Sequence, residues 1–459
     1  MLRPTVPLAL EIALARGAGR LSRLLGAGGG TTVPGKLIWK LDPGAVDRLA
    51  RRLPLGSAVI SATNGKTTTT AMAASILRRR FRLAHNNSGA NLLSGVTSTL
   101  LEAQGADLGL FEVDEAALPE VVERVKPKAV CLGNLFRDQL DRYGELEHVA
   151  EGWRQAVQAM ASGAALVVNG DDPQVGALAD ERPGTLVFGV DDPSVGRPVL
   201  QHAADSKYCV RCGTPYVYAT AYVGHLGDFR CPACDHRRPP LDVVAREIEL
   251  RGLDSVSFKL VSPQGTEHVR LGLPGLYNVY NALAAASLTL TLGATLPEVV
   301  AGLEAFSAAF GRFERIEVGD RKLLMLLIKN PAGANEAVRT IVDGGPPKIA
   351  VVALNDAIAD GRDVSWIWDV DFEPLLAGLD RLVATGERAA ELALRFKYGG
   401  LDPASIEVIP ALDAALDRGL ELTPSGGELL VLPTYTAMLA LRKVIGDRGF
   451  VRPYWERAA

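Results

Sequence analysis

The sequence predicts an α/β protein with two parallel-sheet domains and a small cysteine-rich insertion, and three observations favour this fold. The chain has 459 residues, enough for about two to four domains that each bury a core. Short apolar runs alternate with helical patterns such as 145–162, which is typical of a parallel sheet. After a break near residue 200, a similar alternation returns in the last third of the chain. The apolar runs are 108–113, 128–133, 165–169 and 185–189 in the first part, and 348–354, 381–385 and 428–432 in the last.

Residues 1–50 are predicted to form an N-terminal helix and the segment that leads into the first domain. The apolar side chains of residues 8–25 indicate an amphipathic helix rather than a signal peptide, because Glu11 interrupts the apolar run. We expect this helix to pack on the first domain, and a helix lying on the membrane surface is the alternative. The glycine-rich stretch 26–35 is predicted to be a loop.

The composition is that of a soluble globular protein, and it argues against nucleic-acid binding and against a membrane-spanning segment. Apolar residues make up 48% of the chain and the formal net charge is −4, so nucleic acid is not an expected partner. No apolar run reaches the roughly 18 residues that span a bilayer, so we expect no transmembrane segment. Paired cysteines without a secretion signal favour a metal site over disulfides, and we expect the protein to be cytoplasmic.

Residues 51–312 are predicted to form an ATP-binding domain whose phosphate-binding loop is 63–67. An apolar strand (55–62) precedes the loop and a helix from Thr68 follows it, so backbone N–H groups at a helix N-terminus face the phosphates. Gly65 permits close approach, Lys66 reaches the terminal phosphates, and the Thr67 hydroxyl joins the Mg²⁺ shell. An ordinary Gly-Lys-Thr turn is the alternative. The predicted nucleotide ligands here are Thr63, Asn64, Gly65, Lys66, Thr67 and Thr68.

Two acidic groups follow neighbouring apolar runs of this predicted sheet. Glu112 ends the run 108–113, and Asp138 with Gln139 follows the run 128–133. Because open α/β sheets bind ligands at the carboxyl ends of their strands, we expect these groups to share a site with the nucleotide. Carboxylates beside phosphates are the ligands that Mg²⁺ prefers, although solvated loops are the alternative.

Two C-x-x-C pairs, separated by eighteen residues, lie in the segment 205–240. This spacing is typical of a zinc ribbon, in which four thiolates bind one Zn²⁺, and we interpret the zinc as structural. Two disulfides are the alternative. His225 and His236 are not needed as ligands and are expected at the surface, and the basic residues of the segment are interpreted as a solvated face. The predicted zinc ligands are Cys209, Cys212, Cys231 and Cys234.

The remaining patterns complete the domain organisation. Alternating stretches between 241 and 273 predict antiparallel strands, and 276–306 predicts alanine- and leucine-rich helices. A boundary is expected near 311–313. Residues 313–459 are then predicted to form a second, Rossmann-like α/β domain. Cys131 lies in an apolar run and is expected to be a buried strand thiol.

Several short blocks of the sequence resemble the Mur ligase superfamily, the ATP-dependent enzymes that join amino acids to carboxylates, and they occur along the chain in the order typical of that superfamily. The resemblance covers most of the chain and implies a Mur-ligase-like fold that uses ATP and Mg²⁺. It implies that Lys66 and Thr67 hold phosphate and Mg²⁺, that Glu112 is a Mg²⁺ ligand, that Asn278 lies near the nucleotide, and that Arg312 lies near the phosphates. The blocks are 63–67, 87–91, 112–115, 138–144, 168–173, 275–282 and 310–314.

Two departures from the superfamily pattern indicate a particular branch. Gln139 stands where these enzymes usually have histidine, and Ile328–Gly333 replaces their usual Asp-x-Ala-His-Asn-Pro. Together with the cysteine pairs and the run 354–369, these departures resemble the MurT branch, the synthetase subunits of lipid II isoglutaminyl synthase. That resemblance implies ATP-dependent amidation of the α-carboxyl of D-glutamate in the lipid II stem peptide to D-isoglutamine, through an acyl phosphate.

The same resemblance implies a partner and a third kind of site. Ammonia would come from a GatD-like glutaminase subunit in a heterodimer, working at the inner face of the membrane where lipid II is held. An aspartate of the last domain would complete the partner's Cys–His pair, with Asp356 the first candidate and Asp360 and Asp363 behind it. Three alternatives stay open: another Mur-like amino-acid ligase of the murein-peptide or folylpolyglutamate type, a nucleic-acid-associated P-loop module, and a non-catalytic scaffold for the glutaminase.

Overall fold

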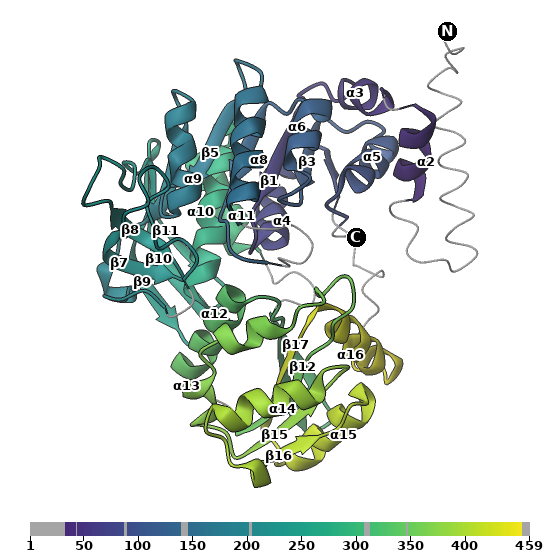
Figure 1. Ribbon diagram of the computed structural model, residues 1–459. Helices are drawn as coiled ribbons and strands as arrows, with labels where there is room; N and C mark the ends of the chain where they lie inside the picture. Colours follow the sequence, from purple (N-terminus) through teal and green to yellow (C-terminus); the bar gives the residue numbers. More distant parts are fainter. Residues whose placement is uncertain are drawn as a thin grey trace.

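The computed structural model describes residues 33–42, 44–86, 90–138, 146–201, 204–306, 313–345 and 348–451 (Figure 1). The predicted N-terminal helix (8–25), Gln139 and Arg312 lie outside these ranges. The predicted α/β fold class is confirmed, and each apolar run expected to be a strand forms one.

The first sheet contains nine strands of the described residues, in the order β11-β10-β9-β6-β5-β4-β1-β3-β2. From β2 to β9 the neighbouring strands pair in parallel, whereas β9, β10 and β11 form an antiparallel meander, as the alternation at 241–273 predicted. The strand β1 lies between β3 and β4. The strands are β1 (Ser57–Ser61), β2 (Leu83–His85), β3 (Leu108–Glu112), β4 (Ala129–Leu132), β5 (Ala165–Asn169), β6 (Leu186–Val190), β9 (Val243–Arg251), β10 (Ser255–Ser262) and β11 (Gly265–Leu271).

Helices cover both faces of this sheet, so its strands are buried on both sides, as a parallel sheet requires (Figure 1). One core forms against α4 (Lys66–Leu77), α10 (Leu276–Thr291) and α11 (Leu296–Glu304). The core on the other face contains Trp153 of α8 and side chains of the remaining helices. These are α2 (Val33–Leu41), α3 (Ala45–Ala50), α5 (Leu93–Glu102), α6 (Leu118–Val125), α8 (Leu146–Ala159), α9 (Pro173–Gly176) and the 3₁₀ turn η1 (Ala177–Glu181), whereas Val195 of the 3₁₀ turn η2 (Pro193–Val195) packs against the first core.

Two boundaries differ from the sequence expectation. The helix α4 begins at Lys66, two residues before the predicted Thr68, because Gly65 already caps it. The helix α2 begins at Val33, so the end of the stretch 26–35 is helical and its prediction as a loop was wrong there. Gly35 is buried in α2, and a Cβ atom there would collide with the backbone of Ser94 in α5, so the glycine serves close helix packing.

The second sheet contains six strands of the described residues, in the order β12-β13-β17-β14-β15-β16. Apart from the antiparallel β12–β13 pair, its neighbours are parallel. Its helices also divide between two faces: α12, α13 and α14 pack on one, and α15 and α16 on the other. The elements are β12 (Phe313–Val318), β13 (Arg321–Leu326), α12 (Pro331–Asp343), β14 (Ile349–Ala353), η3 (Ser365–Asp369), α13 (Glu373–Leu376), β15 (Arg381–Thr385), α14 (Ala389–Tyr398), η4 (Pro403–Ser405), β16 (Ile406–Val408), α15 (Leu412–Leu422), β17 (Glu428–Pro433) and α16 (Tyr435–Asp447).

The cysteine segment interrupts the first sheet between β6 and β9 and forms a separate antiparallel hairpin, β7 (Val217–Val223) with β8 (Leu226–Arg230). Its small core contains aromatic rings and thiols, with Tyr216 and Phe229 stacked edge to face. Figure 1 places this hairpin at the edge of the first domain and α12 at its junction with the second. Within the described residues, no helix is both long and apolar enough to cross a bilayer.

Candidate active site

The loop after β1 is held between the ends of its two neighbouring strands. Gly65 has a φ of 86°, a left-handed conformation that favours glycine, and a Cβ atom there would lie 1.9 Å from Oδ1 of Asn281. Asn134, which follows β4, fixes the loop: its Oδ1 accepts from the Asn64 amide at 2.9 Å, and its Nδ2 donates to the Asn64 carbonyl at 3.1 Å. The Phe136 amide donates to the Thr63 hydroxyl at 3.1 Å. The loop therefore meets α4 in the arrangement that binds phosphate at a helix N-terminus.

The lysine of the loop forms a buried ion pair with Glu115, a short distance beyond the end of β3. Lys66 is 7% exposed and its Nζ contacts the Glu115 carboxylate. Burial by itself would lower the pKa of Lys66, but attraction to Glu115, Asp114 and Glu112 outweighs it and the pKa is raised. Burial would likewise raise the pKa of Glu115, yet Lys66 and Lys329 keep it below its usual range. Both partners are therefore charged, and Lys66 is held at the loop as a cation.

Two oxygen ligands suitable for Mg²⁺ lie at the same strand ends. The Thr67 hydroxyl donates to Oε1 of Glu112 at 2.9 Å. Glu112 ends β3 and is 3% exposed, and Asn86 brackets its backbone with two hydrogen bonds of 2.8 and 2.9 Å. Mg²⁺ keeps several waters and binds proteins through one or two such groups besides phosphate oxygens. The residues present therefore fit a magnesium ion, as the resemblance implied.

The second domain reaches the same loop through Lys329 and Asn330, which precede α12. Asn330 and Asn64 exchange amide hydrogen bonds of 3.0 and 3.2 Å, and Asn330 also caps α12 by accepting from the Gly333 amide at 2.9 Å. Lys329 Nζ donates to the Thr63 carbonyl at 3.0 Å and to Oδ2 of Asp138 at 2.5 Å. The N-termini of α4 and α12 thus lie beside each other, with two lysines between the domains.

Asp138 therefore contacts a lysine in this structure, where the sequence suggested a place in the shared metal and nucleotide site. Burial raises the pKa of Asp138, and Lys329 offsets part of the rise. Gln139 lies outside the described residues.

A cavity runs from the phosphate loop along the junction of the two domains. Thr68 and Asn278, both predicted nucleotide ligands, line it beside Asn64 and Gly65. Asn278 is held by its neighbours, since its Nδ2 donates to the Pro274 carbonyl at 2.7 Å. Much of the remaining lining is apolar and includes Phe136, Val223, Leu226, Leu273, Phe313 and Leu326. One phosphate-binding end and one apolar end suit a nucleoside triphosphate.

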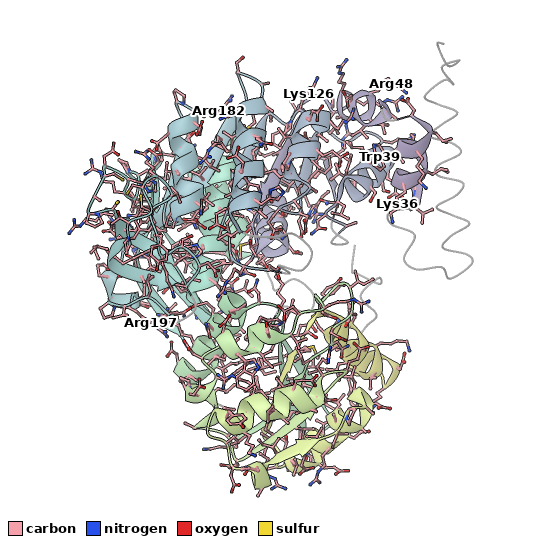
Figure 2. All side chains as sticks on the ribbon, in the orientation of Figure 1. Lys36, Trp39, Arg48, Lys126, Arg182 and Arg197 are labelled. Atoms are coloured by element: carbon pink, nitrogen blue, oxygen red, sulfur yellow. The ribbon has the colours of Figure 1, made fainter. Side chains whose placement is uncertain are left out.

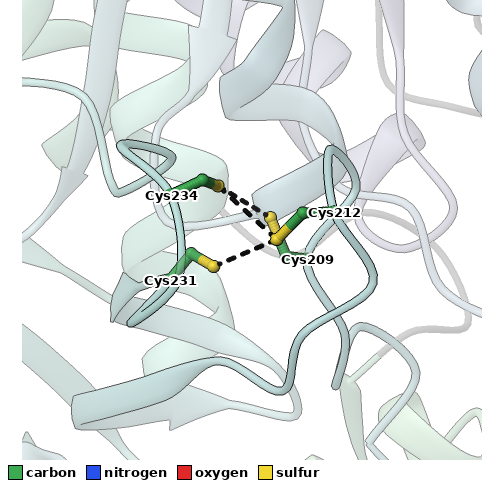
Figure 3. Close-up of side chains that lie close together, drawn as sticks. All are labelled: Cys209, Cys212, Cys231 and Cys234. Carbon is green, nitrogen blue, oxygen red and sulfur yellow. Dashed lines mark hydrogen bonds between the residues drawn. The ribbon is translucent and has the colours of Figure 1, made fainter.

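The four predicted zinc ligands converge on one point (Figure 3). Their sulfur atoms lie 3.5 Å apart for Cys212 and Cys231, 3.6 Å for Cys209 and Cys234, and 3.7 Å for Cys212 and Cys234. Sulfurs around a tetrahedral Zn²⁺ lie about 3.8 Å apart, because each Zn–S bond is about 2.3 Å long. All four thiols are free, and backbone amides donate to Cys209 and Cys231 at 3.4 Å. The residues present therefore fit a four-thiolate zinc ion.

The two histidines of the insertion are buried, so the expectation of surface positions was wrong. His236 is 3% exposed and its Nδ1 lies 2.7 Å from the Tyr216 hydroxyl, so it supports the cysteine cluster from beside it. His225 is fully buried at the turn between β7 and β8, 3.3 Å from Oδ2 of Asp172, with its ring 4.6 Å from that of Phe136. Phe136 lines the nucleotide cavity, so the hairpin tip forms part of that wall.

The basic residues of the insertion are partly neutralised. Arg211 pairs with Asp180 and Asp235, and Arg238 pairs with the buried Asp171. These ion pairs agree with the interpretation of this face as structural rather than as a surface for nucleic acid.

The three candidate aspartates of the last domain occupy one loop and differ in what they bind. Asp356 is partly exposed and accepts from Arg388 Nε at 2.9 Å. Asp360 is 7% exposed and accepts from the backbone and hydroxyl of Thr436, so it holds the loop on α16. Asp363 is exposed and accepts at 2.8 Å from the amide of Ser365, the first residue of η3.

A second cavity is bordered by Lys329 and Asn330, the two residues that contact the phosphate loop. Asp360 and Asp363 line it, and Asp356 is not among its lining residues. Its lining residues are Arg137, Asp138, Lys329, Asn330, Pro331, Asp360, Gly361, Asp363, Ser365, Trp366 and Asp369.

Several residues of the site had no assigned role in the sequence. Glu115 belongs to the block 112–115, in which only Glu112 was given a role. Its ion pair with Lys66 is a tertiary contact, which the sequence does not show. Lys329 and Asn330 were visible only as a departure from a pattern. One feature of the sequence could have identified Asn134 as a site residue, namely its place directly after an apolar run. No feature of the sequence identified Glu336 on α12.

Comparisons with known proteins agree with these observations. A family described as Mur ligase middle domain matches residues 60–212, and one described as MurT ligase C-terminal matches residues 327–438. The chain is 33% identical over 438 residues to the lipid II isoglutaminyl synthase (glutamine-hydrolyzing) subunit MurT of Streptococcus pneumoniae, covering 94% of this chain and 95% of that protein. It is 30% identical to the subunit of the same name from Staphylococcus aureus, covering 96% and 98%.

Solved structures show the same fold at lower identity. A pseudomurein peptide ligase type C from Methanothermus fervidus has a TM-score of 0.68 at 21% identity, covering 85% of this chain and 78% of that one. The folylpolyglutamate synthase of Mycobacterium tuberculosis, complexed with ADP and AMPPCP, has a TM-score of 0.63 at 15% identity, covering 90% and 94%.

Proposed function

Because the chain belongs to the MurT family of the Mur ligase superfamily, we propose that it is the synthetase subunit of a lipid II isoglutaminyl synthase. It amidates the α-carboxyl group of D-glutamate in the stem peptide of lipid II and so forms D-isoglutamine. The carboxylate takes the γ-phosphoryl group of ATP, and ADP leaves. Ammonia then attacks the acyl carbon, the new C–N bond replaces the C–O bond to phosphate, and phosphate and a proton are released.

The observation that carries this proposal is the meeting of the two domains at the phosphate loop. Lys66 and Lys329 are both fixed cations there, and the N-termini of α4 and α12 add a favourable field for anions. Phosphoryl transfer depends mainly on positioning and on neutralising charge, which these groups supply. A magnesium ion at Thr67 and Glu112 would neutralise further charge on the phosphates when bound.

The second cavity is our candidate for the acceptor side of the reaction. It borders Lys329, whose Nζ also contacts the Thr63 carbonyl of the phosphate loop, so a carboxylate bound at this lysine would lie near the γ-phosphate. Arg137 and Lys329 are the basic lining residues of this cavity, beside the acidic Asp360, Asp363 and Asp369.

We propose that the ammonia is produced by a GatD-like glutaminase subunit in a heterodimer, and that Asp356 completes its Cys–His pair. Asp356 is partly exposed, and its hydrogen bonds with Glu387 and then with Arg388 lower its pKa, so it stays charged for a partner's histidine. Asp363 is the next candidate because it too is exposed. Asp360 ranks last, since it is buried and already binds Thr436.

We further propose that Cys209, Cys212, Cys231 and Cys234 bind a structural zinc ion, and that residues 51–312 and 313–459 are the two domains. We propose that the protein works in the cytoplasm at the inner membrane face, and the side chains of α2 support this. Lys36 and Trp39 are exposed there (Figure 2), and Lys40 is exposed beside them. Basic side chains beside an exposed tryptophan are typical of contact with a lipid surface. Sedimentation with anionic vesicles tests this, and unchanged binding after Trp39→Ala with Lys36→Glu would contradict it.

The decisive experiment gives the purified chain ATP, Mg²⁺ and lipid II, first with ammonium and then with glutamine and the glutaminase subunit. We expect lipid II to show the small mass loss of acid-to-amide conversion in both cases. Asp356→Asn should lose the glutamine-dependent reaction and keep the ammonium-dependent one. Incorporation of an added amino acid in place of ammonia would instead identify a Mur-like amino-acid ligase.

A further inference from the structure

A buried glutamate lines the nucleotide cavity without a protein partner. Glu336 belongs to α12, is 2% exposed, and lines the cavity together with Tyr277 and Asn278. Within the described ranges, neither of its carboxylate oxygens has a hydrogen-bond partner. A buried carboxyl group without a partner is costly, so its presence in a binding cavity points to a group on the ligand.

The position of Glu336 along α12 places it away from the phosphates. Gly333, at the start of the helix, is close to Asn64 of the phosphate loop: a Cβ there would lie 3.7 Å from Oδ1 of Asn64. Three residues further along an α-helix correspond to about 4.5 Å of rise. Glu336 therefore lies about one turn beyond the loop, in a cavity whose apolar lining includes Val223 and Leu226 of the β7–β8 hairpin. That apolar lining suits a purine base.

Two polar side chains that also line the cavity, Asn278 and Tyr280, are already bonded to protein. Asn278 donates to the Pro274 carbonyl and accepts from Asn281 at 3.0 Å, and Tyr280 donates to Asp171 at 2.6 Å. Burial raises the pKa of Glu336, and Arg339 and Arg197 offset only part of the rise. The Gln201 amide lowers it slightly without reaching hydrogen-bond geometry. In either protonation state the group keeps an oxygen that accepts a hydrogen bond.

We propose that Glu336 determines the base specificity of the enzyme by accepting a hydrogen bond from the exocyclic amine of adenine. The inference rests on the use of ATP in the proposed function. Guanine carries a carbonyl oxygen at the corresponding ring position, which cannot donate, so GTP would leave the buried carboxyl unpaired. A site built around a hydrogen bond rejects ligands that lack the matching group more strongly than an apolar pocket does.

The test measures nucleotide binding by calorimetry on the complete chain without lipid II. The ligands are ATP, GTP and purine riboside triphosphate, which is ATP without the exocyclic amine. We expect the wild type to bind ATP about 10- to 100-fold more tightly than the analogue lacking the amine. Glu336→Met, which keeps the length of the side chain, should bind the two alike, and Glu336→Ala serves if the methionine variant does not fold.

Glu123→Met, at an exposed position of α6, is the matched control and should keep the wild-type ratio. An unchanged preference for ATP over the analogue in Glu336→Met or Glu336→Ala would overturn the inference, as would equal weakening of all three nucleotides. If Glu336 governs binding but lipid II is not amidated, the proposed function fails and this inference stands. If the wild type binds no nucleotide, both fail.

Discussion

The phosphate loop and the cysteine cluster are both short motifs in the sequence, but they depend on the rest of the chain to different degrees. The four thiols come from residues 209–234 and converge within a hairpin that has its own small core. The loop at 63–67 is held by Asn134, Glu115 and Asn330, the last of them 266 residues away from Asn64. The cysteine cluster is thus local, whereas the arrangement of the loop at 63–67 depends on contacts from both domains.

The largest expected effect comes from a substitution in the phosphate loop that leaves the cysteine cluster intact. Lys66→Ala should lower the rate of amidation by about 100- to 1,000-fold, because it removes a fixed cation from the transferring phosphoryl group. The measurement is the rate of lipid II amidation with ammonium, together with bound zinc, which should not change. Because Glu115 is left buried and unpaired in that variant, Lys66→Arg, which keeps the charge, is made in parallel. Full activity in Lys66→Ala would favour a scaffold role.

The next largest effect is expected from a change in the cysteine cluster that leaves the phosphate loop intact. Cys212→Ser, or chelation of the metal, should remove the zinc and lower the melting temperature by roughly 5 °C or more, since a structural zinc contributes its binding energy to folding. Zinc content and thermal unfolding are measured. The control is Cys131→Ala, at a buried free thiol of β4 outside the cluster, which should keep its zinc. A structural role is excluded if chelation abolishes catalysis and leaves the melting temperature unchanged.

A smaller effect is expected where the two domains touch. Asn330→Ala removes two amide hydrogen bonds to Asn64 and the cap of α12, so the affinity for ATP should fall by about tenfold. Nucleotide titration measures this, with zinc content as the internal comparison. Asn330→Asp separates the two roles, because aspartate can still cap the helix. An affinity equal to that of the wild type in both variants would show that the contact does not support the nucleotide site.

The smallest effect concerns Asp171, which lies between the cluster and the cavity. Asp171 accepts from Tyr280 at 2.6 Å and from Arg238 at 3.2 Å, and burial raises its pKa to about 6 from 3.8. A carboxyl whose pKa is raised by folding stabilises the fold when protonated, and that stabilisation is lost as the pH rises through its folded pKa. The free energy of unfolding should therefore fall between about pH 4 and pH 6, relative to Asp171→Asn. Parallel stability curves for the two proteins would contradict this.

The sequence predicted the local elements well, because each depends on a pattern of neighbouring residues. Buried strands such as β3 and β14 are continuous apolar runs, and the C-x-x-C spacing predicts four converging thiols. Residues whose roles arise from tertiary contact could not be predicted in this way. Lys329 was visible only as a departure from a pattern, and its pairing with Asp138 requires the packing of one domain on the other. The prediction that His225 and His236 lie at the surface was wrong, because the residues next to them in the sequence do not show which aromatic rings pack against them in the fold.

The amide pair between Asn64 and Asn330 has a consequence for how the two domains are held together. A neutral hydrogen bond contributes about 1 kcal/mol net, so the pair stabilises the closed arrangement by about 2 kcal/mol. By itself this corresponds to roughly a 30-fold preference for closure, which leaves the open arrangement populated at a few per cent. The contacts of Lys329 with Thr63 and Asp138 add to this preference, so the amide pair aligns the two helix N-termini without fixing the two domains on its own.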